Sequence, residues 1–243
     1  MKNAHIRIGT TGTLDDTKTH KLMIEGLFGP TIQVTSTVKL MEKKILSNLK
    51  ISCITLKYGE NDRNEIKRAK YQEEVDWLVS SEKRNKFIID LSLKLKGNTL
   101  VLFNFVQKHG KPLYESLRDS SDNPVYFIHG NTDVEEREMI RKIIDTNENS
   151  ILVASYGTCS TGINIKNIHN IIFAFPSKSV IRVLQSIGRG LRTSSTKSIA
   201  KLYDIGDDLQ YKSYKNHTLK HLEERIKIYT NEGFNYESIA IPI

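Results

Sequence analysis

The sequence predicts an α/β fold: a mostly parallel sheet covered by helices on both faces. From residue 97 onward, short apolar runs alternate with amphipathic stretches of helical spacing. The runs are apolar along most of their length, as expected of parallel strands buried on both faces. With 243 residues, the chain can form one large domain or two small ones. The predicted strands lie at residues 99–105, 124–130, 150–157, 170–176 and 198–207.

Before residue 97 the pattern is less regular, and we expect the chain to begin inside another domain. Residues 6–14 read as a short strand followed by a Gly/Thr turn, and residues 15–29 as a helix that Gly29-Pro30 ends. A strand this close to the first residue is typical of the last part of a domain whose beginning lies elsewhere. The apolar side of the helix would consist of Leu22, Met23, Leu27 and Phe28.

Residues 31–96 are predicted to form a connector of strands and charged helices. Trp77 is the only tryptophan, and we interpret it as a packing anchor rather than a platform for base stacking. Two helices would be separated near Ser80-Ser81. The preceding elements are a strand at 31–36, a helix at 38–49, a strand at 51–58 and a turn at 59–62.

The second half of the chain alternates strand and helix, and ligands in such folds bind at the carboxyl ends of the strands. The segment 235–243 reads as a short strand or an extended tail. The predicted helices lie at 106–117, 134–144, 180–191 and 211–232.

Charge and cysteine use restrict the partners and the compartment. The net charge of +8 favours a polyanionic partner, with nucleic acid ahead of a membrane surface. No apolar run approaches the roughly 18 residues of a membrane span, and no signal peptide opens the chain. Cys53 and Cys159 are isolated and lack metal-ligand spacing, so they are expected to be reduced thiols in the cytoplasm. No metal site is predicted.

The stretch from Lys178 to Lys201 has six basic residues and no acidic one. Gln185, Arg189 and Arg192 share one helix face at the edge of an apolar stripe. Two arginines fixed in this way suit the charge that develops on a transferring phosphoryl group. From the pattern alone, a solvated basic face or an ordinary carboxylate partner explains them equally well.

The order of several motifs resembles the carboxyl-terminal part of a superfamily 2 helicase. QSIGRGLR (185–192) matches motif VI, Gln-x-x-Gly-Arg-x-x-Arg, and ILVASYGTCSTGINI (151–165) matches motif V. TLVLFNF (99–105) looks like motif IV, and IHGNTDVEER (128–137) is similar to the segment that follows it. TTGTL (10–14) resembles motif III, which ends the first motor domain. The resemblance covers nearly the whole chain and implies a RecA-like sheet.

The resemblance also implies roles in nucleotide binding. Arg189 and Arg192 would be arginine fingers that neutralise the γ-phosphate of ATP, and Gln185 would orient them or the attacking water. Gly162 and Asn164 match positions that line the nucleotide. Many relatives have Asp where Asn164 stands, which leaves its contact open. The implied cofactors are ATP and Mg²⁺, shared with a first motor domain.

A second implied set contacts the nucleic-acid backbone without reading sequence. For Ser155 and Thr161 the alternative is ordinary hydrogen bonding within a turn. For His129 the alternative is a bond to the backbone at a strand end, and for Arg137 a pair with Asp133. The implied residues are Thr11, Thr13, His129, Gly130, Arg137, Ser155, Tyr156 and Thr161.

By the same resemblance, residues 1–30 would end a first RecA-like motor domain, and residues 31–96 would connect it to a second at 97–210. Residues 211–243 would add a helix and a tail. The sequence has neither GxxxxGK[ST] nor a following acidic pair, so we expect no appreciable ATP hydrolysis by this chain alone. Together with a first motor domain, it would unwind or remodel branched DNA.

Two alternatives belong to other classes. The chain could be a stand-alone, non-catalytic nucleic-acid-binding module, whose binding would depend on salt but not on nucleotide. It could also be a regulator that docks onto another motor domain through residues 60–96. Neither alternative requires arginine fingers.

Overall fold

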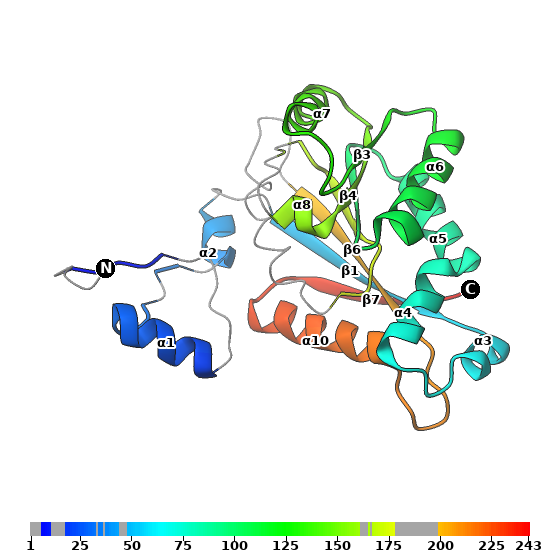
Figure 1. Ribbon diagram of the computed structural model, residues 1–243, viewed down its shortest axis with the longest axis horizontal. Helices are drawn as coiled ribbons and strands as arrows, with labels where there is room; N and C mark the ends of the chain where they lie inside the picture. Colours follow the sequence, from blue (N-terminus) through cyan, green and yellow to red (C-terminus); the bar gives the residue numbers. More distant parts are fainter. Residues whose placement is uncertain are drawn as a thin grey trace.

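The computed structural model contains a sheet of seven strands in the part of the chain that it describes, in the order β3-β4-β2-β5-β6-β1-β7 (Figure 1). Every pairing between these strands is parallel. The strands are β1 (Asn48–Lys57), β2 (Thr99–Phe103), β3 (Val125–Ile128), β4 (Ile151–Ser155), β5 (Asn170–Phe173), β6 (Ile199–Asp208) and β7 (Tyr236–Pro242). The described residues are 6–10, 18–32, 34–35, 37–43, 48–160, 165, 167–177 and 199–243.

The helices connect the strands and lie on both faces of the sheet. An irregular turn of π-helix, η1 (Val106–Gly110), leads directly into α6. The α-helices are α1 (Lys18–Phe28), α2 (Thr37–Glu42), α3 (Glu60–Glu65), α4 (Tyr71–Ser80), α5 (Glu82–Lys94), α6 (Lys111–Ser120), α7 (Val134–Thr146), α8 (Tyr156–Ser160) and α10 (His217–Asn231).

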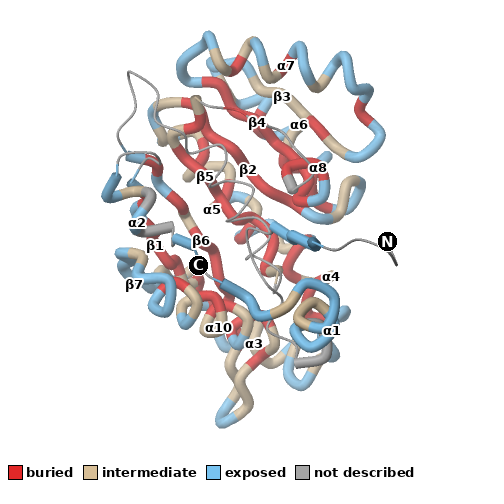
Figure 2. The backbone as a smooth tube through the Cα atoms, turned by 90° about the vertical axis from the view of Figure 1, so that its left-hand side faces the viewer, coloured by how far each residue is buried: buried red, intermediate tan, exposed pale blue. Residues whose placement is uncertain are grey.

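The core is divided between the two faces of the sheet because neighbouring strand residues point in opposite directions. In β2, Leu100 packs on one face and Val101 on the other. Helices α7 and α10 cover the first face, α5 and α6 cover the second, and α4 contributes to both. The middle strands β2, β4 and β5 are buried throughout (Figure 2). The predicted parallel sheet with helices on both faces is confirmed.

The sheet extends beyond residues 97–210. Strand β1, from the predicted connector, pairs with β6 along its full length. Strand β7, from the predicted carboxyl-terminal tail, pairs with β1, and Ile243 N–H donates to the carbonyl of Lys57 at 3.0 Å. One sheet therefore includes strands from three of the four predicted regions.

Several predictions for the first 65 residues are wrong. Residues 6–10, 31–32 and 34–35 form no strand, and Ile6, Ile8, Ile32 and Val34 are at least 80% exposed. A strand needs a hydrogen-bonded neighbour, and these segments have none among the described strands. The helix predicted at 38–49 ends at Glu42, and β1 begins at Asn48. Residues 60–65 form the short helix α3, although a turn was predicted at 59–62. Glu60 and Asp62 lie at the start of this helix, where negative charge is favourable.

The helix predicted at 15–29 is confirmed for Lys18–Phe28, and Gly29 follows it at φ +85°. Figure 1 shows α1 beside the sheet rather than packed on it. Its predicted apolar side is exposed, with Leu22 at 69% and Met23 at 57%. The side chains predicted to form a core therefore have no core to join within the described residues.

The middle of the chain follows the predictions closely. Ser81 separates α4 from α5, and its side chain accepts the N–H of Arg84. Trp77 packs edge-on against Tyr58 with ring centroids 5.4 Å apart, which confirms its packing role. Cys53 and Cys159 are buried free thiols, and burial raises the pKa of each to about 12. In the described residues, no helix has the length and apolar character needed to cross a membrane.

Candidate functional site

The carboxyl ends of the parallel strands meet at one edge of the sheet, where sequence analysis placed the functional residues. The loop after β3 lies at this edge. His129 is half-buried there, and its Nδ1 accepts the N–H of Asn131 at 3.2 Å. The His129 N–H donates to Oγ1 of Thr132 at 3.0 Å. The backbone-bonded alternative for His129 is therefore present in the structure.

Arg137 closes the same loop from the first turns of α7. Its Nη2 donates to the carbonyl of Gly130 at 2.7 Å, so these two predicted site residues are in direct contact. The buried Nε of Arg137 has no hydrogen-bond partner among the described residues. Only the backbone N–H of Arg137 bonds to Asp133, and no side-chain pair joins the two in the described structure.

Ser155 ends β4 and is bonded to the short helix α8. Its Oγ lies 2.7 Å from Oγ1 of Thr158 and accepts the Thr158 N–H at 3.4 Å. Both side chains are buried, Ser155 at 9% and Thr158 at 5% exposure. The turn-bonding alternative for Ser155 is thus also present.

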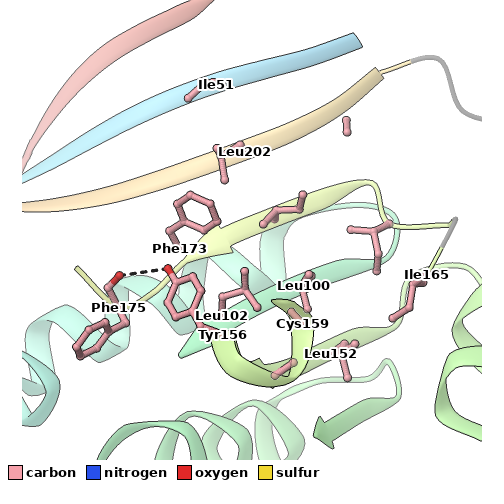
Figure 3. Packing of buried hydrophobic residues seen from close by; sticks show 14 of the residues in the cluster. Ile51, Leu100, Leu102, Leu152, Tyr156, Cys159, Ile165, Phe173, Phe175 and Leu202 are labelled. Carbon is pink, nitrogen blue, oxygen red and sulfur yellow. Dashed lines mark hydrogen bonds between the residues drawn. The ribbon is translucent and has the colours of Figure 1, made fainter. Parts of the chain in front are cut away.

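The Tyr156 side chain, which was expected to contact the nucleic-acid backbone, points into the core. The hydroxyl donates to the carbonyl of Phe175 at 3.2 Å, and the ring packs beside Phe173 (Figure 3). Burial raises the pKa of Tyr156 far above its ordinary value. The motif indicated that Tyr156 lies where an apolar strand ends. Its aromatic ring nevertheless packs into the core, because its surroundings are apolar.

Phe175 belongs to residues 174–177, the stretch from which the chain continues into 178–198. Several hydrogen bonds fix this stretch. Ala174 N–H donates to the carbonyl of Leu102 at 3.1 Å, and Ser177 N–H donates to that of Phe175 at 2.8 Å. The Phe175 ring also packs edge-on against Phe105, with centroids 5.3 Å apart.

A buried arginine from each face of the sheet binds the same stretch. Arg225 of α10 donates from Nη1 to the carbonyl of Ser177 at 3.0 Å. Arg84 of α5 donates from Nη1 to the carbonyl of Ala174 at 2.7 Å. The Arg84 and Arg225 side chains are 0% and 1% exposed. Arginine suits this task because its planar group can bind a carbonyl and a carboxylate together.

Each arginine also pairs with an aspartate of β6. Arg225 binds Asp204 through Nε and Nη2, each within 2.8 Å of a carboxylate oxygen. Arg84 Nε donates to Oδ1 of Asp207 at 2.8 Å. Residues 204 and 207 are three positions apart, so their side chains leave opposite faces of the strand. The two ion pairs thus fasten residues 174–177 to the carboxyl end of β6 from both sides.

Two tyrosines complete these pairs. Tyr229 donates to Oδ2 of Asp204 at 2.7 Å, and Tyr58 donates to Oδ1 of Asp207 at 2.8 Å. Burial and the neighbouring carboxylates raise the pKa of both phenols. Nη2 of Arg84 and Oδ2 of Asp207 lack a partner within the described residues, which leaves the Arg84 side less completely bonded.

The local sequence pattern does not predict these ion pairs, although β6 carries a usable signal. The run IAKLYDIGDD places Asp204 and Asp207 among apolar residues of a predicted strand. A buried carboxylate requires a cationic or hydrogen-bonding partner. The sequence therefore indicates that partners exist, but spacing cannot identify Arg84 and Arg225, which lie 123 and 21 residues away from the aspartates they bind.

The remaining predicted site residues lie outside the described residues. They comprise the three residues expected to act on the γ-phosphate, the two expected to line the nucleotide and three threonines of the nucleic-acid set. They are Gln185, Arg189, Arg192, Gly162, Asn164, Thr11, Thr13 and Thr161.

Comparison with known proteins defines the class. Residues 82–194 match the family model of the helicase conserved C-terminal domain. The C-terminal domain of the DEAD-box protein Dbp5 shares the fold, with a TM-score of 0.50 and 12% identity over 82% of this chain and 92% of that one. Residues 82–194 therefore resemble a helicase C-terminal domain, and the sheet has the RecA-like fold of such domains.

A particular relative is the ATP-dependent DNA helicase UvsW of Enterobacteria phage T4. It is 36% identical over 97% of this chain, and the match covers 49% of UvsW. The crystal structure of T4 UvsW superposes with a TM-score of 0.71 and 35% identity over 89% of this chain and 44% of that one. This chain thus spans about half the length of the relative it matches.

Proposed function

We propose that this chain is the carboxyl-terminal half of an ATP-dependent DNA helicase that works in the cytoplasm with a first motor domain. The observation that carries the proposal is the likeness to UvsW over 97% of the chain, with the motifs in the family's order. Branched DNA is the proposed substrate. The net charge of +8 supports a nucleic-acid partner.

Arg189 and Arg192 are the proposed arginine fingers, with Gln185 as their orienting neighbour. Gly162 and Asn164 would line the nucleotide, and ATP with Mg²⁺ would be held mainly by the first domain. Arginine fingers must be fixed in position, because their guanidinium groups stabilise the negative charge that develops on the transferring phosphoryl group. The fixed stretch 174–177, just before 178–198, supports this arrangement: it gives that segment a rigid starting point.

We retain seven residues as proposed contacts with nucleic acid. Four lie in the described part of the chain, namely His129, Gly130, Arg137 and Ser155, and three lie outside it, namely Thr11, Thr13 and Thr161. Contact between Arg137 and Gly130 supports a shared role at the strand edge. Tyr156 takes a different part. Because its hydroxyl holds Phe175, we assign it to positioning residues 174–177 rather than to binding phosphate.

The exposed apolar side chains of the first 30 residues support a first motor domain as the partner of this chain. Ile6 and Ile8 are 81% and 82% exposed, and Leu27 on α1 is 56% exposed. Large exposed apolar surfaces usually mark an interaction site. In the proposal, the rest of the first motor domain covers them.

The test is ATP turnover with branched DNA, for the chain alone and mixed with a separately prepared first motor domain. We expect turnover only in the mixture, reduced roughly a thousandfold or more by Arg189→Ala, as for other arginine fingers. Arg192→Ala should act similarly. Arg118→Ala is the matched control, since this exposed arginine pairs with Asp119 and lies over the Tyr114 ring, away from the predicted motifs.

No turnover in the mixture, with DNA binding unchanged by Arg189→Ala and Arg192→Ala, would contradict the motor function. That outcome would instead support a non-catalytic nucleic-acid-binding module.

A further inference from the structure

A surface away from the predicted motifs carries lysines and tyrosines in alternation. It is formed by the loop between β6 and α10, the first turns of α10, the link between α3 and α4, and the first residue of α4. Figure 1 shows the loop projecting beyond the end of the sheet. We call this surface the Tyr/Lys surface. It comprises Lys67, Tyr71, Tyr211, Lys212, Tyr214 and Lys220.

The lysines of this surface lie over the tyrosine rings. Lys67 Nζ is 5.7 Å and Lys212 Nζ is 5.5 Å from the centroid of the Tyr211 ring. Lys220 Nζ is 5.4 Å from that of Tyr214. Three of the four cation–π contacts in the described structure are thus concentrated here. Contacts at this distance hold a flexible ammonium group in place without neutralising it.

The rings themselves are held by neighbouring groups. Tyr211 and Tyr214 form an antiparallel bridge, with N–H···O distances of 3.0 and 2.9 Å in the two directions. The Tyr214 hydroxyl lies 3.3 Å from Nε2 of His217. Tyr71 packs against His221 with centroids 5.2 Å apart, which joins α4 to α10. The surface is therefore a connected arrangement of side chains rather than a set of independent ones.

Basic residues predominate in the segments that form most of this surface. Residues 66–72 and 209–221 contain six Lys or Arg residues and no Asp or Glu. Lys215 pairs with Glu223. Lys67, Lys212 and Lys220 are exposed and have no carboxylate partner in the described part of the chain. These three ammonium groups are available to an anionic ligand.

We propose that the Tyr/Lys surface binds single-stranded nucleic acid. Such strands need cationic groups for successive phosphates and aromatic faces for unpaired bases, and this surface provides both at short spacing. An acidic peptide would use the lysines but not the rings, and a duplex keeps its bases stacked on one another. The site lies outside all the helicase motifs and does not require ATP hydrolysis.

The test measures binding of a fluorescent 20-nucleotide oligo(dT) to the whole chain by anisotropy as salt is varied. We expect Lys67→Ala/Lys212→Ala/Lys220→Ala to weaken binding about tenfold or more. The log–log salt slope should become shallower by about 2, from roughly 0.7 for each of three lost phosphate contacts. The matched control is Lys86→Ala/Lys94→Ala/Lys111→Ala, which removes the same charge from exposed positions of α5 and α6. It should change affinity less than twofold.

The rings are tested separately by Tyr211→Ala, which leaves the net charge unchanged. Binding of oligo(dT) should fall several-fold, while binding of an abasic strand of equal length should not. Equal weakening by the two triple variants, or competition by polyglutamate as effective as that by oligo(dT), would overturn the proposal. No ATP turnover in the mixture with a first motor domain, with oligo(dT) binding to the Tyr/Lys surface retained, would leave it standing, so the two proposals can fail independently.

Discussion

Arg225 and Asp204 are both buried away from water, and the charge of each is compensated by the opposite charge of the other. Burial alone would lower the pKa of Arg225, but the Asp204 carboxylate more than offsets this and raises it. Removing one member of such a pair leaves an uncompensated buried charge, which costs about 3–5 kcal/mol. The same guanidinium also holds Ser177, so the pair links stability to the position of residues 174–177.

We therefore expect Arg225→Met to lower the free energy of unfolding by about 3–5 kcal/mol, measured by urea denaturation. Adding Asp204→Asn should restore part of this loss, because the stranded carboxylate becomes neutral. If the double variant is less stable than Arg225→Met, the buried charge is not the cause. Arg118→Ala, at an exposed ion pair, should change stability by less than about 1 kcal/mol.

His109 is a second residue whose pKa is changed by burial. Its ring is 0% exposed, and neither ring nitrogen has a partner among the described residues. Burial, with a smaller contribution from the charge of Arg84, lowers its pKa from 6.5 to about 3. Between these values the unfolded chain binds a proton that the folded chain does not, so stability falls as the pH is lowered through this range.

The expected slope from His109 approaches about 1.4 kcal/mol per pH unit between pH 6 and pH 4. His109→Leu should lose less stability over this interval than the parent protein, as measured by urea denaturation at several pH values. His129→Leu is the comparison, since His129 is only half-buried. Equal pH dependence in the parent and His109→Leu would show that other groups dominate acid unfolding.

At the scale of elements, the start of α10 depends on a carboxylate from another helix. Glu74 of α4 is 2% exposed and accepts the N–H groups of His217 at 2.9 Å and Thr218 at 2.7 Å. It also accepts from the Asn216 amide at 2.8 Å. A negative charge at a helix N-terminus is favourable, and here it replaces a cap from the helix's own sequence.

Glu74→Gln should therefore destabilise the protein by about 2 kcal/mol, because an amide cannot accept on both sides. Hydrogen exchange should speed up most in the first turn of α10. Glu115→Gln, on the exposed side of α6, is the control, with an expected change below about 0.5 kcal/mol. Uniform exchange throughout the molecule would argue against a local capping role.

Elements with strong local patterns were predictable, and those defined by distant partners were not. The apolar runs fixed β2, β4 and β5, and Ser81 marked the break between α4 and α5. The segments at 6–8 and 31–36 carry β-forming residues, but pattern alone cannot reveal whether a neighbouring strand exists. Helix α8 was missed because five residues are too few to show a period.

At the scale of the whole molecule, the parallel sheet covered on both faces was predictable, but strand order was not. No local signal indicates that β1 lies between β6 and β7. For the candidate site, the motif predicted that an apolar strand ends near Ser155 and Tyr156, and these residues lie at the end of β4 and the start of α8. It could not predict that the Tyr156 ring turns inward, because that depends on space beside Phe173 and Phe175.

The place of β1 also determines when the protein can fold during synthesis. β1 ends at residue 57, but its partners begin at residues 199 and 236. The ribosome must add 142 further residues before the first partner even starts to emerge (199 − 57 = 142). At about 5–20 residues per second, this apolar strand waits unpaired for roughly 7 to 28 seconds. The half of the sheet that holds Asp204 and Asp207 is therefore completed last. During synthesis, β1 is the strand that chaperones can bind for the longest time before it pairs.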